Sequence, residues 1–256
     1  MTRSVDFHSH ILPGIDDGSP SVEVSIAMLQ MEAAQGIQYV VATPHFYAHH
    51  DNLDRFLENR AKSERMLREE MAKHTDLPEL IIGAEVHFFS GMDDSRAISS
   101  LTIGSTNYIL IEMPHPPWPE EMYRKLERIY ENQGLIPIMA HVDRYIGRFR
   151  TFGIPKRLAE LPVLVQANAE FFLEKGTMPM ALRMLRRGDI HLLGSDCHNL
   201  SSRKPNLGDA VKLIETRLGE TAISKMNKLE HAVLLGKNPY YPHTGVKNTV
   251  NGDDEK

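Results

Sequence analysis

The chain has 256 residues, of which 41% are hydrophobic and 25% charged, a composition typical of a folded protein with one large core. A formal net charge of -5 without a long basic run argues against nucleic acid as a partner, and no segment reaches the roughly 20 apolar residues of a membrane-spanning helix. The single cysteine excludes an internal disulfide, and the N-terminus lacks the apolar stretch of a signal peptide, so we expect a cytoplasmic protein without direct membrane insertion.

Short β-rich runs alternate with amphipathic helical stretches along the chain, which is typical of a parallel α/β fold. The expected strands run from Ser4 to His10, Gln38 to Thr43, Leu80 to Val86, Tyr108 to Met113, Leu135 to His141, Val163 to Ala167 and Ile190 to Ser195. The expected helices run from Pro20 to Gln35, Leu53 to Lys73, Glu120 to Gln133, Pro179 to Arg187, Leu207 to Leu218 and Leu229 to Leu235. Ser19 or Ser21 is the expected N-cap of the first helix, and Gly36 its stop.

Seven β/α units in one uninterrupted chain predict a distorted (β/α)7 barrel of the TIM kind, with an open doubly wound sheet as the alternative. We expect a single domain over residues 1–245. The polar tail, residues 246–256, is expected to be disordered.

The 13 histidines are the unusual feature of the composition, and many of the His, Asp and Glu residues fall where predicted strands end. In a parallel barrel these ends meet at one rim, which is where active sites are built. Nine residues of metal-ligand type would share this rim: His8, His10, Asp17, His45, Glu85, Glu112, His141, Asp196 and His198.

Five imidazoles and four carboxylates in one place require cations, because clustered carboxylates repel and buried charges are costly. Residues two apart on a strand face the same way, so His8 and His10 should point together, while Cys197 should turn away from Asp196 and His198. Mixed nitrogen and oxygen ligands without thiolate suit manganese, iron or zinc, and nine ligands suit two or three ions. Asp16 is the alternative to Asp17, since the sequence leaves open which carboxylate turns inward.

The ordered motifs resemble the polymerase and histidinol phosphatase (PHP) superfamily over about Val5 to Pro239. They are His8-Ser9-His10, Asp16-Asp17-Gly18, Thr43-Pro44-His45, Gly83-Ala84-Glu85, Glu112, His141-Val142-Asp143-Arg144-Tyr145 and Ser195-Asp196-Cys197-His198-Asn199. Within the superfamily the chain looks like the bacterial manganese-dependent protein tyrosine phosphatases of capsule and exopolysaccharide gene clusters. That narrower resemblance depends on Asp17, Glu112, Arg144, and Arg203 with Lys204-Pro205.

The resemblance implies a PHP fold and a centre of three ions, with manganese as the metal. It assigns His8, His10, Glu85 and Asp196 to the first ion, Glu85, Glu112 and His141 to the second, and Asp17, His45 and His198 to the third. It also implies a phosphotyrosine protein as substrate, namely a bacterial tyrosine kinase that regulates capsule or exopolysaccharide synthesis.

Our hypothesis for the mechanism is direct attack on phosphorus by a metal-bridging hydroxide, with Arg144 and Arg203 binding the phosphoryl oxygens. Cys197 is not the expected nucleophile. Although Arg203 stands six residues after it, the intervening loop lacks the glycines that expose backbone amides to phosphate. The general acid stays open between His115, Asp143 and a metal-bound water.

The sequence also leaves alternatives open for three aromatic residues and for the function of the whole protein. Tyr47, Phe88 and Trp118 either pack their loops or stack against a phosphotyrosine ring. The alternatives for the whole protein are a small-molecule phosphatase such as one acting on histidinol phosphate, a phosphodiesterase or nuclease of the same superfamily, and a non-catalytic regulator that binds phosphoproteins.

Overall fold

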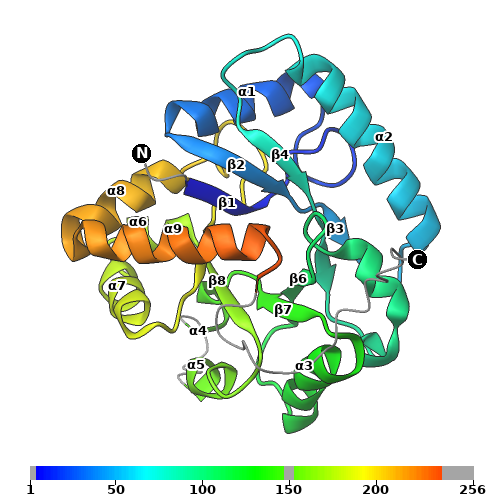
Figure 1. The fold of residues 1–256 in the computed structure, drawn as a ribbon, viewed down its shortest axis with the longest axis vertical. Helices are drawn as coiled ribbons and strands as arrows, with labels where there is room; N and C mark the ends of the chain where they lie inside the picture. Colours follow the sequence, from blue (N-terminus) through cyan, green and yellow to red (C-terminus); the bar gives the residue numbers. More distant parts are fainter. Residues whose placement is uncertain (1–3, 147–152, 238–256) are drawn as a thin grey trace, which may run out of the picture.

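The computed structural model describes residues 4–146 and 153–237, and in these ranges helices lie around a curled, entirely parallel set of strands (Figure 1). The hydrogen-bonded order is β1-β2-β4 in one sheet and β3-β5-β6-β7-β8-β9 in the other. The strands are β1 (Ser4–Ser9), β2 (Ile37–Ala42), β3 (His45–Phe46), β4 (Glu79–Ile82), β5 (Glu85–His87), β6 (Tyr108–Glu112), β7 (Ile136–Met139), β8 (Leu164–Asn168) and β9 (Leu192–Gly194). The predicted parallel α/β class is confirmed. The expected domain limit and tail lie outside the described residues.

One predicted strand is interrupted, and one short strand was not predicted. The expected strand from Leu80 to Val86 is split into β4 and β5, and a short β3 follows β2 after Thr43-Pro44. Pro44 cannot donate to a ladder, which accounts for the break before β3. Strand β2 pairs with β4, and β3 pairs with β5. Strand β3 therefore continues the line of β2, and β5 continues the line of β4, so each pair occupies one strand position around the barrel. Within the described ranges the nine strands therefore follow seven lines.

The first and last strand lines meet directly beside the predicted ligands. Ser9 forms a parallel bridge with Cys197, the His10 amide donates to Cys197 O at 2.9 Å, and the Asp196 amide donates to His8 O at 2.7 Å. A Cβ on Gly194 would lie 2.6 Å from His8 Cβ, so only glycine permits this approach. This junction brings residues almost 190 positions apart into one centre.

The helices are α1 (Val22–Ala34), α2 (Leu53–Met71), α3 (Glu120–Gln133), α4 (Asp143–Ile146), α5 (Gly153–Leu158), α6 (Ala169–Leu173), α7 (Met178–Arg187), α8 (Leu207–Leu218) and α9 (Glu220–Leu234), with 3-10 turns η1 (Met92–Asp94) and η2 (Arg96–Leu101). Ser21, rather than Ser19, caps α1 by accepting from the Val24 amide. The short helices α4, α5 and α6 were not predicted, because four to six residues are too few to show a helical period.

Helix α9 begins nine residues before the predicted start at Leu229. Its early turns look polar in sequence, yet Ile223, Met226 and Glu230 are buried along one face. Figure 1 shows α9 crossing the strands, and its Val233 joins the buried cluster that contains Val5 of β1. None of the helices in the described ranges combines the length and apolarity needed to cross a membrane.

Candidate metal centre

The centre is built first on β1, where His8 and His10 are buried with their ring nitrogens facing each other. Their Nε2 atoms are 3.1 Å apart. On the opposite side of each ring, His8 Nδ1 lies 3.4 Å from Gln166 Oε1 and His10 Nδ1 lies 2.8 Å from Asp16 Oδ2. A neutral imidazole that donates from Nδ1 has a lone pair at Nε2, so these partners direct two lone pairs at one point. That arrangement suits a shared cation.

Glu85, at the start of β5, lies at the middle of the cluster with 1% of its surface exposed. Its Oε1 is 2.8 Å from His141 Nε2, and its Oε2 is 2.8 Å from His45 Nδ1. The same Oε2 lies 3.4 Å from both His8 Nε2 and His10 Nε2. One carboxylate therefore reaches all sides of the centre, as a bridging ligand must.

A second side of the centre combines Glu112, at the end of β6, with His141, which follows β7. Glu112 Oε1 lies 3.5 Å from His141 Nε2. Its Oε2 lies 3.1 Å from Nδ1 of His87, which is not among the residues predicted as ligands. The available signal was its place two residues after Glu85, on the same face of the strand. His87 orients Glu112 from outside the nine predicted residues.

A third group consists of His10, Asp17, His45 and His198, whose ligand atoms all lie within 4.8 Å of one another. Asp17 Oδ1 is 3.4 Å from His45 Nε2 and 3.5 Å from His198 Nε2. Asp16 instead accepts from the backbone amides of Gly18 and His45, besides contacting His10. The geometry thus favours Asp17 as the ligand and Asp16 as the residue that orients His10.

Asp196, after β9, completes the enclosure beside the β1 histidines. Its Oδ1 lies 3.6 Å from His8 Nε2 and 3.5 Å from His10 Nε2. Asp196 and His141 are the non-glycine residues with positive φ among those described, at 52° and 33°. Such backbone is uncommon outside glycine and occurs often at functional sites.

Strand β8 contributes two supporting residues, Gln166 and Asn168, that are not among the predicted site residues. Gln166 Oε1 accepts from the His141 amide at 2.6 Å and faces His8. Asn168 Nδ2 donates to Asp196 Oδ2 at 3.0 Å. Their spacing of two on one strand was the signal that could have found them. Amide side chains at these places fix the orientation of three predicted ligands.

The residues present fit a cluster of divalent cations. Among the described residues, three buried ligand atoms have no regular hydrogen-bond partner although they belong to the ligand groups: Glu85 Oε2, His45 Nδ1 and His198 Nε2. Three overlapping groups have the spacing of metal ligands: His8-His10-Glu85, His45-Glu85-Glu112 and His10-Asp17-His45-His198. Nitrogen and carboxylate oxygen without thiolate suit manganese, iron or zinc.

The electrostatics also favour positive charge in the centre. Burial by itself would lower the pKa of His10, but hydrogen bonds to Asp16, Asp196 and Glu85 raise that pKa well above its ordinary value. The pKa of Glu112 falls to about 2 despite burial, because His141 and His87 hydrogen-bond to it. The carboxylates that favour a proton on His10 favour a metal ion equally well.

Both predicted arginines converge on Asp196. Arg203 donates to Asp196 Oδ1 at 2.8 Å, and Arg144 donates to Asp196 Oδ2. The His198 amide donates back to Arg203 O at 2.8 Å, and this tight turn carries the guanidinium over the rim. The two arginines line a cleft of about 540 Å³ that extends from Asp196 past Ser201. Two partly exposed guanidiniums beside carboxylate ligands form an anion-binding edge.

Cys197 is fully buried, and its sulfur lies near Asp6 and Glu32. Burial raises the pKa of its thiol well above the usual range, so a nucleophilic thiolate is disfavoured. Trp118 is also buried, with its indole N–H donating to Pro114 O, which identifies it as a loop-packing residue. The ring of Tyr47, in contrast, is partly exposed and lies 5.4 Å from that of His45.

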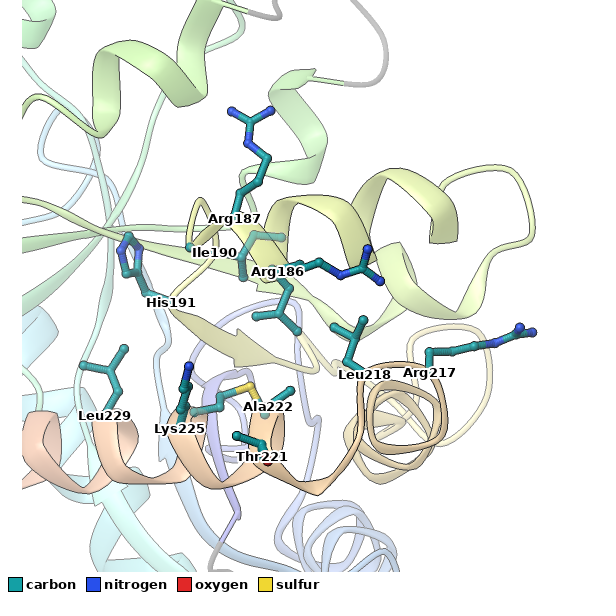
Figure 2. Close-up of a pocket in the computed structure, with 13 residues that line it drawn as sticks. Arg186, Arg187, Ile190, His191, Arg217, Leu218, Thr221, Ala222, Lys225 and Leu229 are labelled. Carbon is teal, nitrogen blue, oxygen red and sulfur yellow. The ribbon is translucent and has the colours of Figure 1, made fainter.

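A separate cavity of about 510 Å³ lies away from the predicted ligands (Figure 2). It is bordered by the ends of α7 and α8, by α9 and by the segment that enters β9. Lys225 points into the space, whereas Arg187 points away from it and pairs with Asp189. Burial lowers the pKa of His191 to about 4, which leaves a neutral ring. This cavity lacks the ligand set that marks the centre.

The chain is similar over nearly its whole length to known tyrosine-protein phosphatases. The chain is 24% identical over 250 residues to the tyrosine-protein phosphatase CpsB of Streptococcus agalactiae, covering 92% of this chain and 99% of the relative. It is 28% identical over 251 residues to the tyrosine-protein phosphatase YwqE of Bacillus subtilis, covering 91% and 92%.

The fold matches a solved structure from work on YwqE of Bacillus subtilis and CpsB of Streptococcus pneumoniae, described as unique metal-dependent tyrosine phosphatases. The TM-score is 0.81 at 24% identity, covering 95% of this chain and 99% of the other. The profile described as "Capsular polysaccharide synthesis, CpsB/CapC" matches residues 4–235. The chain therefore belongs to the CpsB/CapC family of capsular polysaccharide synthesis.

Proposed function

We propose that this protein is a metal-dependent protein tyrosine phosphatase that holds three manganese ions. The observation that carries the proposal is a set of three overlapping ligand groups, with Arg144 and Arg203 at their edge. Two of the groups share the buried Glu85, and the third is joined to them through His10 and His45. Relatives across nearly the full chain length are named tyrosine-protein phosphatases. The first ion would be held by His8, His10, Glu85 and Asp196, the second by Glu85, Glu112 and His141, and the third by Asp17, His45 and His198.

The reaction requires a charged phosphate monoester to accept a nucleophile, and the residues divide that work. When bound, clustered divalent ions neutralise phosphoryl oxygens and lower the pKa of water towards 7. Glu85 keeps the ligand groups together, and the hydrogen bonds of Asp16 and Gln166 hold His10 and His8 in the ligating orientation. Arg144 and Arg203 orient the phosphoryl group with planar, permanently charged guanidiniums.

A phosphotyrosine protein suits the surroundings of this centre. The cleft beside Arg203 is open to solvent and lined by polar side chains such as Ser201 and Asn206, which can contact peptide backbone. Tyr47 presents a partly exposed ring beside His45, where a substrate ring can stack. In keeping with the family, we propose a tyrosine kinase of capsule or exopolysaccharide synthesis as the natural substrate.

Protonation of the leaving phenolate, whose pKa is about 10, needs less assistance than that of an alkoxide. Asp143 lies at this edge of the site, and burial raises its pKa. Its Oδ1 accepts from the Asn168 amide at 2.9 Å, so this carboxyl is already engaged in holding the end of β8. This contact favours a positioning role for Asp143.

The decisive experiment compares phosphotyrosine peptide, phosphoserine peptide, histidinol phosphate and single-stranded DNA as substrates in Mn²⁺. We expect kcat/KM for phosphotyrosine peptide to exceed the others by at least tenfold. A preference for histidinol phosphate would support a small-molecule phosphatase instead. Tight phosphopeptide binding without turnover would support a non-catalytic regulator. Either of these two results would overturn the proposal.

A further inference from the structure

A buried pair of carboxyls, Asp6 on β1 and Glu32 on α1, lies directly behind the metal centre. Both residues are fully buried. Their carboxyl oxygens approach within 4.8 Å of each other and of the Cys197 sulfur. Asp6 and Glu32 belong to neither the predicted ligands nor the phosphate-binding arginines, so the proposed reaction gives them no task.

One oxygen of Asp6 ties the two strands that supply the first ligand group. Asp6 Oδ1 accepts from the His8 amide at 3.0 Å and from the Ser195 amide at 2.9 Å. His8 is itself a predicted ligand, and Ser195 immediately precedes Asp196. The regular pairing of β1 with β2 also shifts between Asp6 and Ser9. Asp6 therefore supplies hydrogen bonds at the place where the β1 ladder is irregular.

We infer that the Glu32 carboxyl is the hydrogen-bond partner of the other oxygen of Asp6, Oδ2. Within the described part of the chain, no amide donates to Asp6 Oδ2 or to either oxygen of Glu32, and the hydroxyl that bears on both carboxyls is that of Ser195. Two adjacent buried carboxyls with so few donors between them satisfy each other best when one proton is shared. Burial, followed by the charge of Asp6, raises the pKa of Glu32 well above its usual value, which agrees with a protonated partner.

A cation in place of the proton is less suitable here. The third group nearby is the Cys197 thiol, and burial keeps it protonated by raising its pKa. A protonated thiol is a poor metal ligand. The pair is better understood as a support for the backbone than as another metal site.

We propose that Asp6, held by Glu32, is a positioning residue that sets the separation of His8 and Asp196 and thereby the affinity of the first metal position. The inference rests on the ligand set of the proposed function. Outer residues that orient metal ligands typically change metal affinity or activity by 10–100-fold when mutated.

The chain offers a matched control in Glu230 of α9. Glu230 is also a buried carboxyl, and its Oε2 accepts from the Val5 amide at 3.3 Å, at the beginning of the same strand. Loss of Glu230 should lower stability as loss of Asp6 does, because each leaves a β1 amide without its acceptor. Only Asp6 lies next to the ligands.

The test measures Mn²⁺ stoichiometry and dissociation constants by competition with a chromophoric chelator, together with Tm. We expect Asp6→Ala to raise the Mn²⁺ dissociation constant of the first metal position at least tenfold. Asp6→Asn should stay within threefold of wild type, because the amide oxygen can accept from both backbone amides while its N–H₂ donates to Glu32. Glu230→Ala should lower Tm and leave Mn²⁺ affinity within threefold.

Wild-type affinity in a folded Asp6→Ala protein would overturn the inference, as would an equal loss of affinity in Asp6→Ala and Glu230→Ala. If Asp6→Ala does not fold, Glu32→Ala and Glu32→Gln replace it. Weakened binding in the former with retention in the latter supports the inference, and any other pattern overturns it. Failure of the wild-type protein to bind Mn²⁺ would instead refute the proposed function, so the two failures are distinguishable.

Discussion

The Nε2 atoms of His8 and His10 lie 3.1 Å apart while each ring has an acceptor at its Nδ1. Two neutral rings that donate outward in this way bring their lone pairs together, an arrangement that a cation bound at both Nε2 atoms would stabilise. This relationship links the backbone alternation of β1 to the chemistry of the centre.

Metal removal and His10→Ala are expected to abolish phosphotyrosine hydrolysis by the same route. His10 contributes to two of the three ligand groups, so its loss removes one ligand from each of them. Chelation should reduce turnover of the wild-type protein by at least a hundredfold, with recovery on adding Mn²⁺, whereas His10→Ala should not recover. The control is His74→Ala, because His74 is partly exposed near the end of α2. Substantial turnover by metal-stripped protein contradicts the metal mechanism.

Arg203→Ala is expected to lower kcat/KM for phosphotyrosine peptide by about ten- to a hundredfold, corresponding to roughly 1.4–2.7 kcal/mol. Arg203→Lys should recover only part of this loss, because an ammonium lacks the planar fork that contacts two phosphoryl oxygens. Arg186→Ala is the matched control, since Arg186 lines the separate cavity of Figure 2. Equal effects at positions 186 and 203 would indicate a general charge effect.

Cys197→Ser is expected to retain hydrolysis within about fivefold of wild type, because the buried sulfur lies near Asp6 and Glu32 and is held as a thiol. The measurement is kcat with phosphotyrosine peptide, accompanied by a Tm that reports any cost of burying a hydroxyl. A loss above a hundredfold in a well-folded variant would identify cysteine chemistry and exclude the mechanism proposed above.

The pH dependence of stability should differ between wild type and Glu230→Gln. Burial raises the pKa of Glu230 from 4.5 to about 8. A raised pKa stabilises the fold fully below the unfolded value, and this contribution is lost as pH rises through the folded value. Wild type should therefore lose stability relative to Glu230→Gln between pH 5 and 9, measured by urea unfolding. A difference that is constant with pH would show that Glu230 does not titrate in this range.

The sequence by itself determined the class of fold and the positions of the ligand-type residues. Helices α3 and α8 begin and end where predicted, since strong amphipathic patterns and a terminal glycine such as Gly134 are local signals. The strand ends near His8, Glu112 and Asp196 could also be located from local patterns, because short apolar runs in the sequence indicate buried strands. Parallel strands then require these exits to meet.

Only the tertiary structure decided how those residues are oriented. Our proposal of Asp17 rather than Asp16 as a ligand depends on a hydrogen bond to Asp16 from the amide of His45, 29 residues away. Gln166 and Asn168 matter because β8 lies beside β7 and β9, which their own sequence does not reveal. The pairing of Asp6 with Glu32 likewise requires α1 against β1. Hydrogen-bond geometry is set by contacts distant in sequence, whereas hydrophobic periodicity is local.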